Sequence, residues 1–211
     1  MMVDKKKLVL MFNIFFFHLF CLASFGENNV HNRDIETYLN SIKTLKARLI
    51  QISGNGAVET GSLFINKPGK MRFEYDPPSN HLVMASGLLL VVIDRKSTSE
   101  PQRYFTSQTP IGYLLNENIS LNQNRSLKTV ILKDSFVHIT FYDPQRPTAG
   151  ELELVFSKNP IQLHEWTITN YSGEETRVLL EQLIINEPVN EKLFNIGREI
   201  SNVQRKILKN K

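Results

Sequence analysis

The chain has 211 residues, 41% of them hydrophobic, and its formal net charge is +4. This length and apolar content are enough for one ordinary domain with a core of its own. Part of the positive charge lies at the extreme N-terminus, and nothing in the rest indicates the clustered basic face that nucleic-acid binding needs.

Residues 1–26 have the pattern of a secretory signal peptide. Three lysines at 5–7 precede an apolar run at residues 8–25, and the small residue Gly26 stands at a suitable cut site. The run has barely ~18 residues, the lower limit for a membrane span, so we expect cleavage and export rather than an anchor. Cys21 is the only cysteine and lies inside this run, so the mature chain has none for a disulfide or a nucleophile. A lipid-modified Cys21 is the alternative, which the bulky residue before it disfavours.

The first segment of the mature chain with a clear period spans residues 33–49. Its apolar residues recur at helical spacing, at Ile35, Leu39, Ile42 and Leu45. This pattern predicts one amphipathic helix with a single apolar face.

From residue 47 the apolar residues recur at every second position, which is typical of strands. Asn55-Gly56 separates the first two runs and is the strongest short signal for a β-hairpin. About ten or eleven such segments, separated by turn residues at a spacing of roughly 8–12 residues, predict an antiparallel sandwich or barrel in a single domain, residues 27–197. The segments are 47–53, 58–66, 70–76, 81–85, 88–94, 102–107, 128–133, 136–143, 150–157, 162–170 and 176–185.

A short apolar segment, residues 109–115, departs from the strand pattern. Thr109 and Pro110 suit the N-cap and the first position of a helix, and three apolar residues behind them share one face: Ile111, Leu114 and Leu115. Gly112 either weakens this helix so that it can move, or allows it to pack closely against a strand. The chain then ends in a basic segment, residues 198–211, which we expect to be a frayed helix or disordered.

The sequence lacks the common motifs of enzyme chemistry. There is no Gly-x-Ser-x-Gly or His-Glu-x-x-His, and the glycine-rich stretch at 54–56 joins two strands rather than opening a helix. The histidines of the mature chain are scattered without metal-ligand spacing. We therefore expect no catalysis, no cofactor and no metal.

The most specific pattern is GSLFINKPGKMRFEYDPP at residues 61–78. It is followed by an apolar strand that ends in Gly87, by LVVIDR at 90–95 and by TPIGYLL at 109–115. These four motifs, in this order, resemble the periplasmic outer-membrane lipoprotein carrier family, LolA. The resemblance covers residues 33 to about 196.

This resemblance implies a mainly β (α+β) fold, an incomplete antiparallel β-barrel whose open side is plugged by helices over an apolar cavity. It implies a monomeric periplasmic chaperone that takes acylated lipoproteins from an ATP-driven release complex of the inner membrane and delivers them to the outer membrane, where a lipoprotein receptor is a further implied partner. The residues expected to line the acyl-chain cavity are Leu39, Ile42, Leu63, Ile65, Phe73, Tyr75, Val83, Ile111, Tyr113, Leu114 and Leu115.

Lys67 and Pro68 stand where the family commonly has Arg-Pro, and in the family that arginine is linked to opening and closing of the lid. Lysine keeps the charge but lacks the planar fork of donors, so Lys67 either does the same job less rigidly or the lid is governed differently.

Two other functions are compatible with the residues. The first is a stand-alone binding module of the same fold that senses lipid or lipoprotein, and a transfer assay would separate it from a carrier. The second is a lipid hydrolase, which the missing nucleophile arrangement disfavours.

Overall fold

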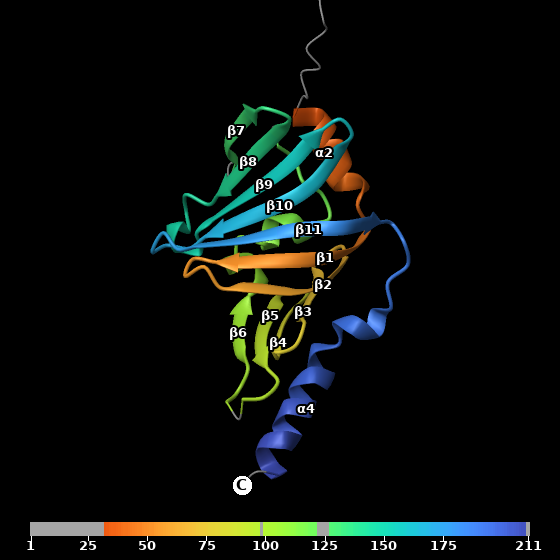
Figure 1. Ribbon diagram of the computed structural model, residues 1–211, viewed down its shortest axis with the longest axis vertical. Coiled ribbons are helices and arrows are strands. Elements are labelled where there is room, and N and C mark those ends of the chain that lie inside the picture. The colour runs from red at the N-terminus through yellow and green to blue at the C-terminus, as the bar shows by residue number, and fades with distance from the viewer. Residues whose placement is uncertain (1–31, 98, 122–126, 210–211) are drawn as a thin grey trace, which may run out of the picture. The chain divides into compact units, whose positions relative to one another are not determined.

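The computed structural model describes residues 32–97, 99–121 and 127–209. The predicted signal peptide and its cut site lie outside the described residues. In chain order (Figure 1) the elements, with η for a 3₁₀ helix, are α2 (Asn32–Ser41), β1 (Thr44–Ser53), β2 (Val58–Asn66), β3 (Lys70–Tyr75), β4 (His81–Ser86), β5 (Leu89–Asp94), β6 (Gln102–Phe105), η1 (Thr106–Gln108), α3 (Gly112–Leu115), β7 (Leu127–Lys133), β8 (Phe136–Tyr142), η2 (Pro147–Ala149), β9 (Glu151–Lys158), β10 (Ile161–Thr169), β11 (Glu175–Ile185), η3 (Glu191–Phe194) and α4 (Ile196–Lys209).

The strands form one antiparallel sheet of eleven strands in the order β6-β5-β4-β3-β2-β1-β11-β10-β9-β8-β7. Nearly all neighbours are consecutive in the chain; the exception is β1, which pairs with β11 in the middle of the sheet. Within the described part of the chain β6 and β7 each pair with one neighbour only, so the sheet is not closed into a barrel. The predicted fold class, an incomplete antiparallel barrel with a few helices, is confirmed.

The Asn55-Gly56 hairpin is confirmed. Val58 pairs with Ile52 directly after the turn, and the Gly56 amide donates to the Ser53 carbonyl at 2.8 Å. Gly56 has φ +80°, a left-handed conformation that glycine adopts without strain.

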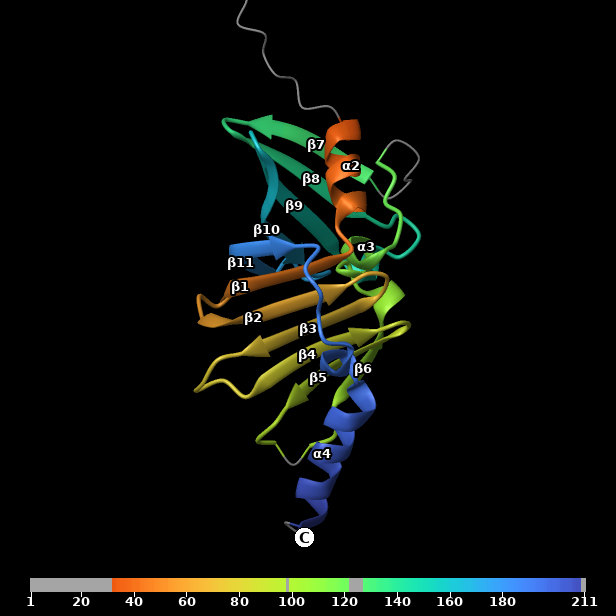
Figure 2. The same cartoon turned by 90° about the vertical axis from the view of Figure 1, so that its right-hand side faces the viewer.

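The sheet has apolar side chains on both faces. One face, called here the inner face, carries Phe73, Trp166 and Phe141; the ring centroids of Phe73 and Trp166 are 5.8 Å apart. The helices α2 and α3 contact this face, since Tyr38 packs edge-on against Phe156 and Tyr113 stacks on Phe141 at 5.3 Å. Figures 1 and 2 show α2 beside the β7–β10 half of the sheet.

The outer face of β4 and β5 forms a second core with α4. It consists of Leu82, Met84, Val91, Ile93, Ile196 and Val203, with Leu89, Ile200 and Ile207 packed against it. Because successive strand residues point to opposite faces, Leu82 and Met84 face α4 while Val83 between them faces inward. Figure 2 shows α4 beside this lower half of the sheet.

The prediction of one helix over 33–49 is wrong in its second half. The helix ends at Ser41, and Leu45 lies on β1, which pairs on both sides with β2 and β11. The side chain of Asn186 fixes the change of direction, because it accepts from the Lys43 amide at 2.8 Å and donates to the Ser41 carbonyl at 3.0 Å. The backbone hydrogen bonds of β1 to two neighbouring strands outweigh the local helical preference of residues 42–49.

The prediction of a frayed or disordered basic tail is also wrong for the residues described. A helix runs from Ile196 to Lys209, and Ile196 and Val203 are buried. Its apolar residues cover the outer face of β4 and β5. Arg72, which bonds to Glu199 of this helix, is only 5% exposed.

Candidate functional site: the inner face and its cover

The residues predicted to line the cavity meet on the inner face and in the two helices over it. The register places Leu63 opposite Phe73, and Phe73 opposite Val83. All of the predicted residues except Val83 and Tyr113 are buried, with exposed fractions of 0–9%. Their side chains cover one another and leave little apolar surface open to solvent, and we call this arrangement the closed form.

Aromatic side chains of β3 and β10, which are not neighbours in the sheet, meet on the inner face. Phe73 stacks on Tyr75, with ring centroids 6.4 Å apart, and lies next to Trp166. The Tyr75 hydroxyl donates to the side-chain oxygen of Gln51 at 2.6 Å. Burial, reinforced by the carboxylate of Glu59, raises the pKa of Tyr75, so its ring stays neutral.

The turn between β2 and β3 joins both helices. The Lys67 ammonium donates to the Leu39 carbonyl of α2 at 3.0 Å, and the Gly69 amide donates to the Leu115 carbonyl of α3 at 2.9 Å. Both acceptors lie in the last turn of their helices, where carbonyls have no partner within the helix. A cation is also favourable at a helix C-terminus. The turn therefore latches the ends of α2 and α3 with one side chain and one backbone group.

Lys67 is half-buried in this position. Burial, reinforced by the nearby positive charge of Lys43, lowers its pKa to about 8. The ammonium is thus still mainly charged at pH 7 but held in an environment that disfavours the charge.

The short helix α3 begins later than predicted. It spans Gly112–Leu115 with Ile111 as its N-cap, and Thr109 instead donates its hydroxyl to the Thr106 carbonyl at 2.7 Å. A Cβ on Gly112 would lie 2.7 Å from that same carbonyl oxygen. Gly112 therefore allows close packing, against η1 rather than against a strand.

Sequence reasoning missed how α2 is tied to the residues after α3. The Asn40 side chain donates to the Ile119 carbonyl at 2.9 Å and accepts from the Ile119 amide at 2.8 Å. Glu36 accepts from the Leu121 amide at 2.9 Å. We call α2, α3 and residues 116–121 together the cover, because these bonds connect them into one unit over the inner face. An asparagine and a glutamate on the polar side of a helix gave no signal of this.

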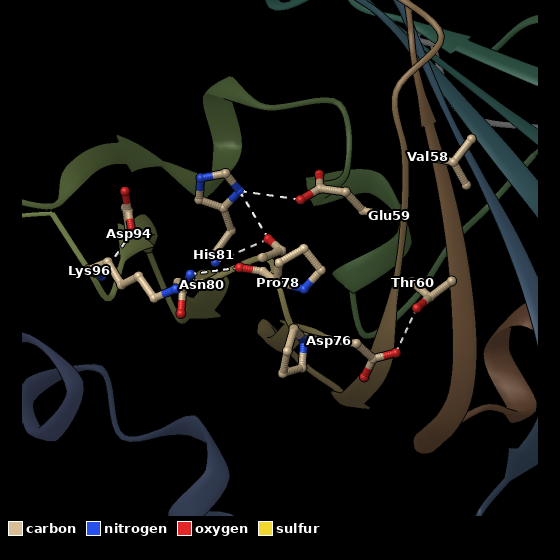
Figure 3. Close-up of a pocket in the computed structure, with 11 residues that line it drawn as sticks. Val58, Glu59, Thr60, Asp76, Pro78, Asn80, His81, Asp94 and Lys96 are labelled. Carbon is tan, nitrogen blue, oxygen red and sulfur yellow. Dashed lines mark hydrogen bonds and ion pairs between the residues drawn. The ribbon is translucent and has the colours of Figure 1, made fainter.

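A separate polar pocket of about 480 Å³ lies at the other end of β2, β3 and β4 (Figure 3). Asp76 accepts from the Thr60 hydroxyl at 2.7 Å, and His81 lies 3.5 Å from the Glu59 carboxylate. Within the described ranges no group of three or more His, Cys, Asp or Glu residues could hold a metal ion. This pocket contains none of the predicted cavity residues.

The comparison with protein families decides what this arrangement belongs to. Residues 40–197 match the family model described as outer membrane lipoprotein carrier protein LolA. The chain belongs to the LolA family. The predicted family is therefore confirmed.

Individual relatives are distant. A protein described as an outer-membrane lipoprotein carrier protein in Coxiella burnetii (strain RSA 331 / Henzerling II) is 26% identical over 203 residues, which covers 90% of this LolA-family chain and 92% of that protein. An uncharacterized protein of Rickettsia prowazekii (strain Madrid E) is 27% identical over 152 residues, 71% of this chain and 70% of that one. A crystal structure of a LolA superfamily protein from Nitrosomonas europaea aligns with a TM-score of 0.43 at 11% identity, covering 80% of this chain and 99% of that one.

No helix among the described residues is long and apolar enough to span a bilayer.

Proposed function

We propose that this LolA-family chain is a periplasmic carrier for the acyl chains of lipoproteins. It takes its cargo from an ATP-driven release complex of the inner membrane and delivers it to the outer membrane, where a receptor accepts it. The observation that carries the proposal is the latch at residues 67–69, which holds the ends of two helices over an apolar inner face.

In the closed form the inner face is filled by the side chains of the cover, so loading requires the cover to move. Leu39 of α2 and Leu114 and Leu115 of α3 would leave the inner face, and acyl methylenes would take over their apolar contacts. The latch itself is weak, because a hydrogen bond contributes a net ~1 kcal/mol. Burying an acyl chain of a dozen methylenes is worth roughly 10 kcal/mol at about 0.8 kcal/mol per CH₂. Cargo can displace the cover where this gain exceeds both the latch and the burial that Leu39, Leu114 and Leu115 give up.

Lys67 and Pro68 are the proposed lid control. Lys67 reaches the backbone of α2 in the closed form, as the family's arginine would be expected to do, but with a single donor group. Opening would release its ammonium from the buried position to water. The hydrogen bond of Lys67 therefore holds the cover closed, while the cost of burying its ammonium favours opening.

The proposal is tested by a photo-crosslinker placed on each face of the sheet. At Leu114 or Phe73, on the inside, it should capture the acyl chains of a loaded lipoprotein. At Lys46, which lies on the outer face between the inward-facing Leu45 and Ala47, it should capture little. Equal capture from both faces, or none from the inside, would exclude an acyl-binding interior.

A transfer assay separates the carrier from a sensing module of the same fold. A loaded carrier incubated with outer-membrane vesicles should hand its lipoprotein over, whereas a sensor would bind the cargo and keep it. Capture of cargo without transfer would support the binding site but would indicate a sensing module rather than a carrier.

A further inference from the structure

The outer end of α4 carries an unneutralised cluster of positive charge. Arg205, Lys206 and Lys209 are exposed, and none of the ion pairs among the described residues involves them. The only acidic residue of this helix, Glu199, is already paired with Arg72 and lies near Arg95. Sequence residues 200–211 contain four basic residues and no acidic one.

These cations surround a groove of about 390 Å³ between α4 and the end of β5. It is lined by Arg95, Glu199, Asn202, Val203, Arg205, Lys206 and Lys209. The Lys206 ammonium donates to the Arg95 carbonyl at 3.2 Å, which holds the end of the helix against the sheet. Leu208, at the same end of the helix, is 71% exposed and stands between Lys206 and Lys209 in the chain.

We propose that this end of α4 docks on a bilayer surface that contains anionic phospholipid. Lysine and arginine side chains near such a surface attract its phosphate groups, and an exposed leucine among them can enter the headgroup region. The apolar stripe of α4 is already occupied by β4 and β5, so the helix does not lie in the membrane plane. The contact is peripheral and electrostatic.

A bilayer fits this surface better than an acidic protein does. A specific protein interface needs a shaped, desolvated core and typically ~1,200 Å² or more of buried surface. Here the only strongly exposed apolar side chain of the helix is Leu208, and the cations are on long, flexible side chains. A fluid anionic surface needs no matching shape.

The basic end of α4 lies away from the inner face, so a protein docked through it could still exchange a ligand at that face. The groups that bind α4 lie on the outer face of the sheet, opposite to the inner face and its cover. Docking through α4 would therefore leave the cover free to move. The inference rests on α4 alone and does not require the carrier function.

The test is co-sedimentation of the whole exported chain with vesicles. At low salt the protein should bind vesicles that contain phosphatidylglycerol and should not bind vesicles of phosphatidylcholine alone. At ~1 kcal/mol per basic residue, the triple variant Arg205→Gln, Lys206→Gln, Lys209→Gln should lose roughly 100-fold in vesicle affinity. The matched control Arg103→Gln, Lys133→Gln, Lys192→Gln removes the same charge elsewhere and should bind nearly as the wild type does.

Two further measurements keep the test decisive if the triple variant folds poorly. Raising the salt concentration should release the wild-type chain from anionic vesicles, because screening weakens exposed charges. Leu208→Ser keeps all of the positive charge, so it should still bind anionic vesicles in preference to vesicles of phosphatidylcholine alone. Equal binding to both kinds of vesicle, binding that salt does not change, or binding only to an acidic protein would overturn the proposal.

Discussion

At the residue scale, the turn at residues 67–69 bonds to the ends of both helices of the cover. Lys67 takes the place of an arginine, and unlike arginine it can lose its proton in an accessible pH range. Its pKa of about 8 in the closed form is below the ordinary value of 10.5. Burial therefore opposes the positive charge of Lys67 in the closed form.

The first prediction follows from the sign of this shift. Between pH 8 and about 10.5 the unfolded chain keeps the proton of Lys67 while the closed form has lost it, so the free energy of unfolding should rise with pH in this range. Lys67→Arg does not titrate there, so the wild type should gain stability relative to this variant as the pH rises. Urea unfolding followed by Trp166 fluorescence measures the difference.

The same reasoning applies to Lys67→Leu, which removes the hydrogen bond to Leu39 at every pH. Its loss relative to wild type should be smaller near pH 7, where leucine also removes a buried charge, than near pH 10. The control is Lys133→Arg at an exposed position, which should leave the pH curve unchanged. Parallel curves for wild type and Lys67→Arg would mean that Lys67 is solvated and holds nothing.

Arg72 is the second residue with a testable role. Its guanidinium donates to Glu74 at 2.9 Å, to Glu199 of α4 at 3.2 Å and to the Leu193 carbonyl at 3.0 Å. Burial acts to raise the pKa of Glu74, but the hydrogen bonds from Arg72 and Arg95 outweigh it, and the pKa lies below its ordinary value. Arg72 thus joins β3 to η3 and α4.

The second prediction is that Arg72→Ala destabilises the fold by about 3–5 kcal/mol, since it removes the buried cation of this network and leaves Glu74 and Glu199 with Arg95 alone. The matched control is Arg177→Ala, whose ion pair with Glu165 is exposed on the arginine side; we expect a change of no more than ~1 kcal/mol there. Equilibrium unfolding in urea measures both. Similar small effects at the two sites would show that α4 is held by its apolar residues alone.

At the element scale, α3 shows how a short helix can be defined by its packing. Four residues are too few to form a stable helix by propensity. The helix exists because Leu114 and Leu115 are buried, Gly112 touches η1, and the Gly69 amide caps its last carbonyl.

The third prediction compares two helical glycines. Gly112→Ala should destabilise the protein by about 1–3 kcal/mol, because the new Cβ would lie 2.7 Å from a backbone oxygen, although alanine is the better helix former. Gly197→Ala in α4 should be neutral or stabilising by up to ~1 kcal/mol, since its Cβ meets only the Asn195 side chain at 3.5 Å. Thermal unfolding of the two variants gives the comparison. A stabilising Gly112→Ala would show that α3 and η1 separate in solution.

At the scale of the whole molecule, the open sheet has two apolar faces with different covers. On the outer face α4 is held by a core cluster and by the ion pairs of Arg72. On the inner face the cover is held by hydrogen bonds at its helix ends and by apolar side chains that an acyl chain could replace. This difference agrees with a fixed outer helix and a movable inner cover.

The fourth prediction uses Trp166, the only tryptophan of the chain, which is 0% exposed on the inner face. An acylated lipoprotein whose chains carry bromine should quench its fluorescence, because bromine quenches on contact. The control is Trp166→Phe with Thr167→Trp, which moves the single indole to the opposite face of β10. Quenching should then fall to the level seen with soluble bromide. Equal quenching in both proteins would show that the acyl chains do not enter the inner face.

The sequence by itself determined the strand segments, the Asn55-Gly56 hairpin and the membership of the LolA family. Strand alternation and turn residues are local, and they act over a few neighbours along the chain. The predicted cavity residues also lie together, since alternation on β2 and β3 fixes which side chains share a face. Most of them are buried in this structure, and their role in binding acyl chains stays a prediction.

The tertiary structure alone decided where α2 ends, what α4 does and how the cover is held. Each depends on partners far away in the chain: Asn186 beside Ser41, β4 beside Val203, and Lys67 beside Leu39. The local pattern at 33–49 continues a helical period through Leu45, but β1 gains more from pairing with two strands. Apolar residues recur among the basic residues at 198–211, but the sequence does not reveal their partner. The structure shows that they pack on the outer face of β4 and β5.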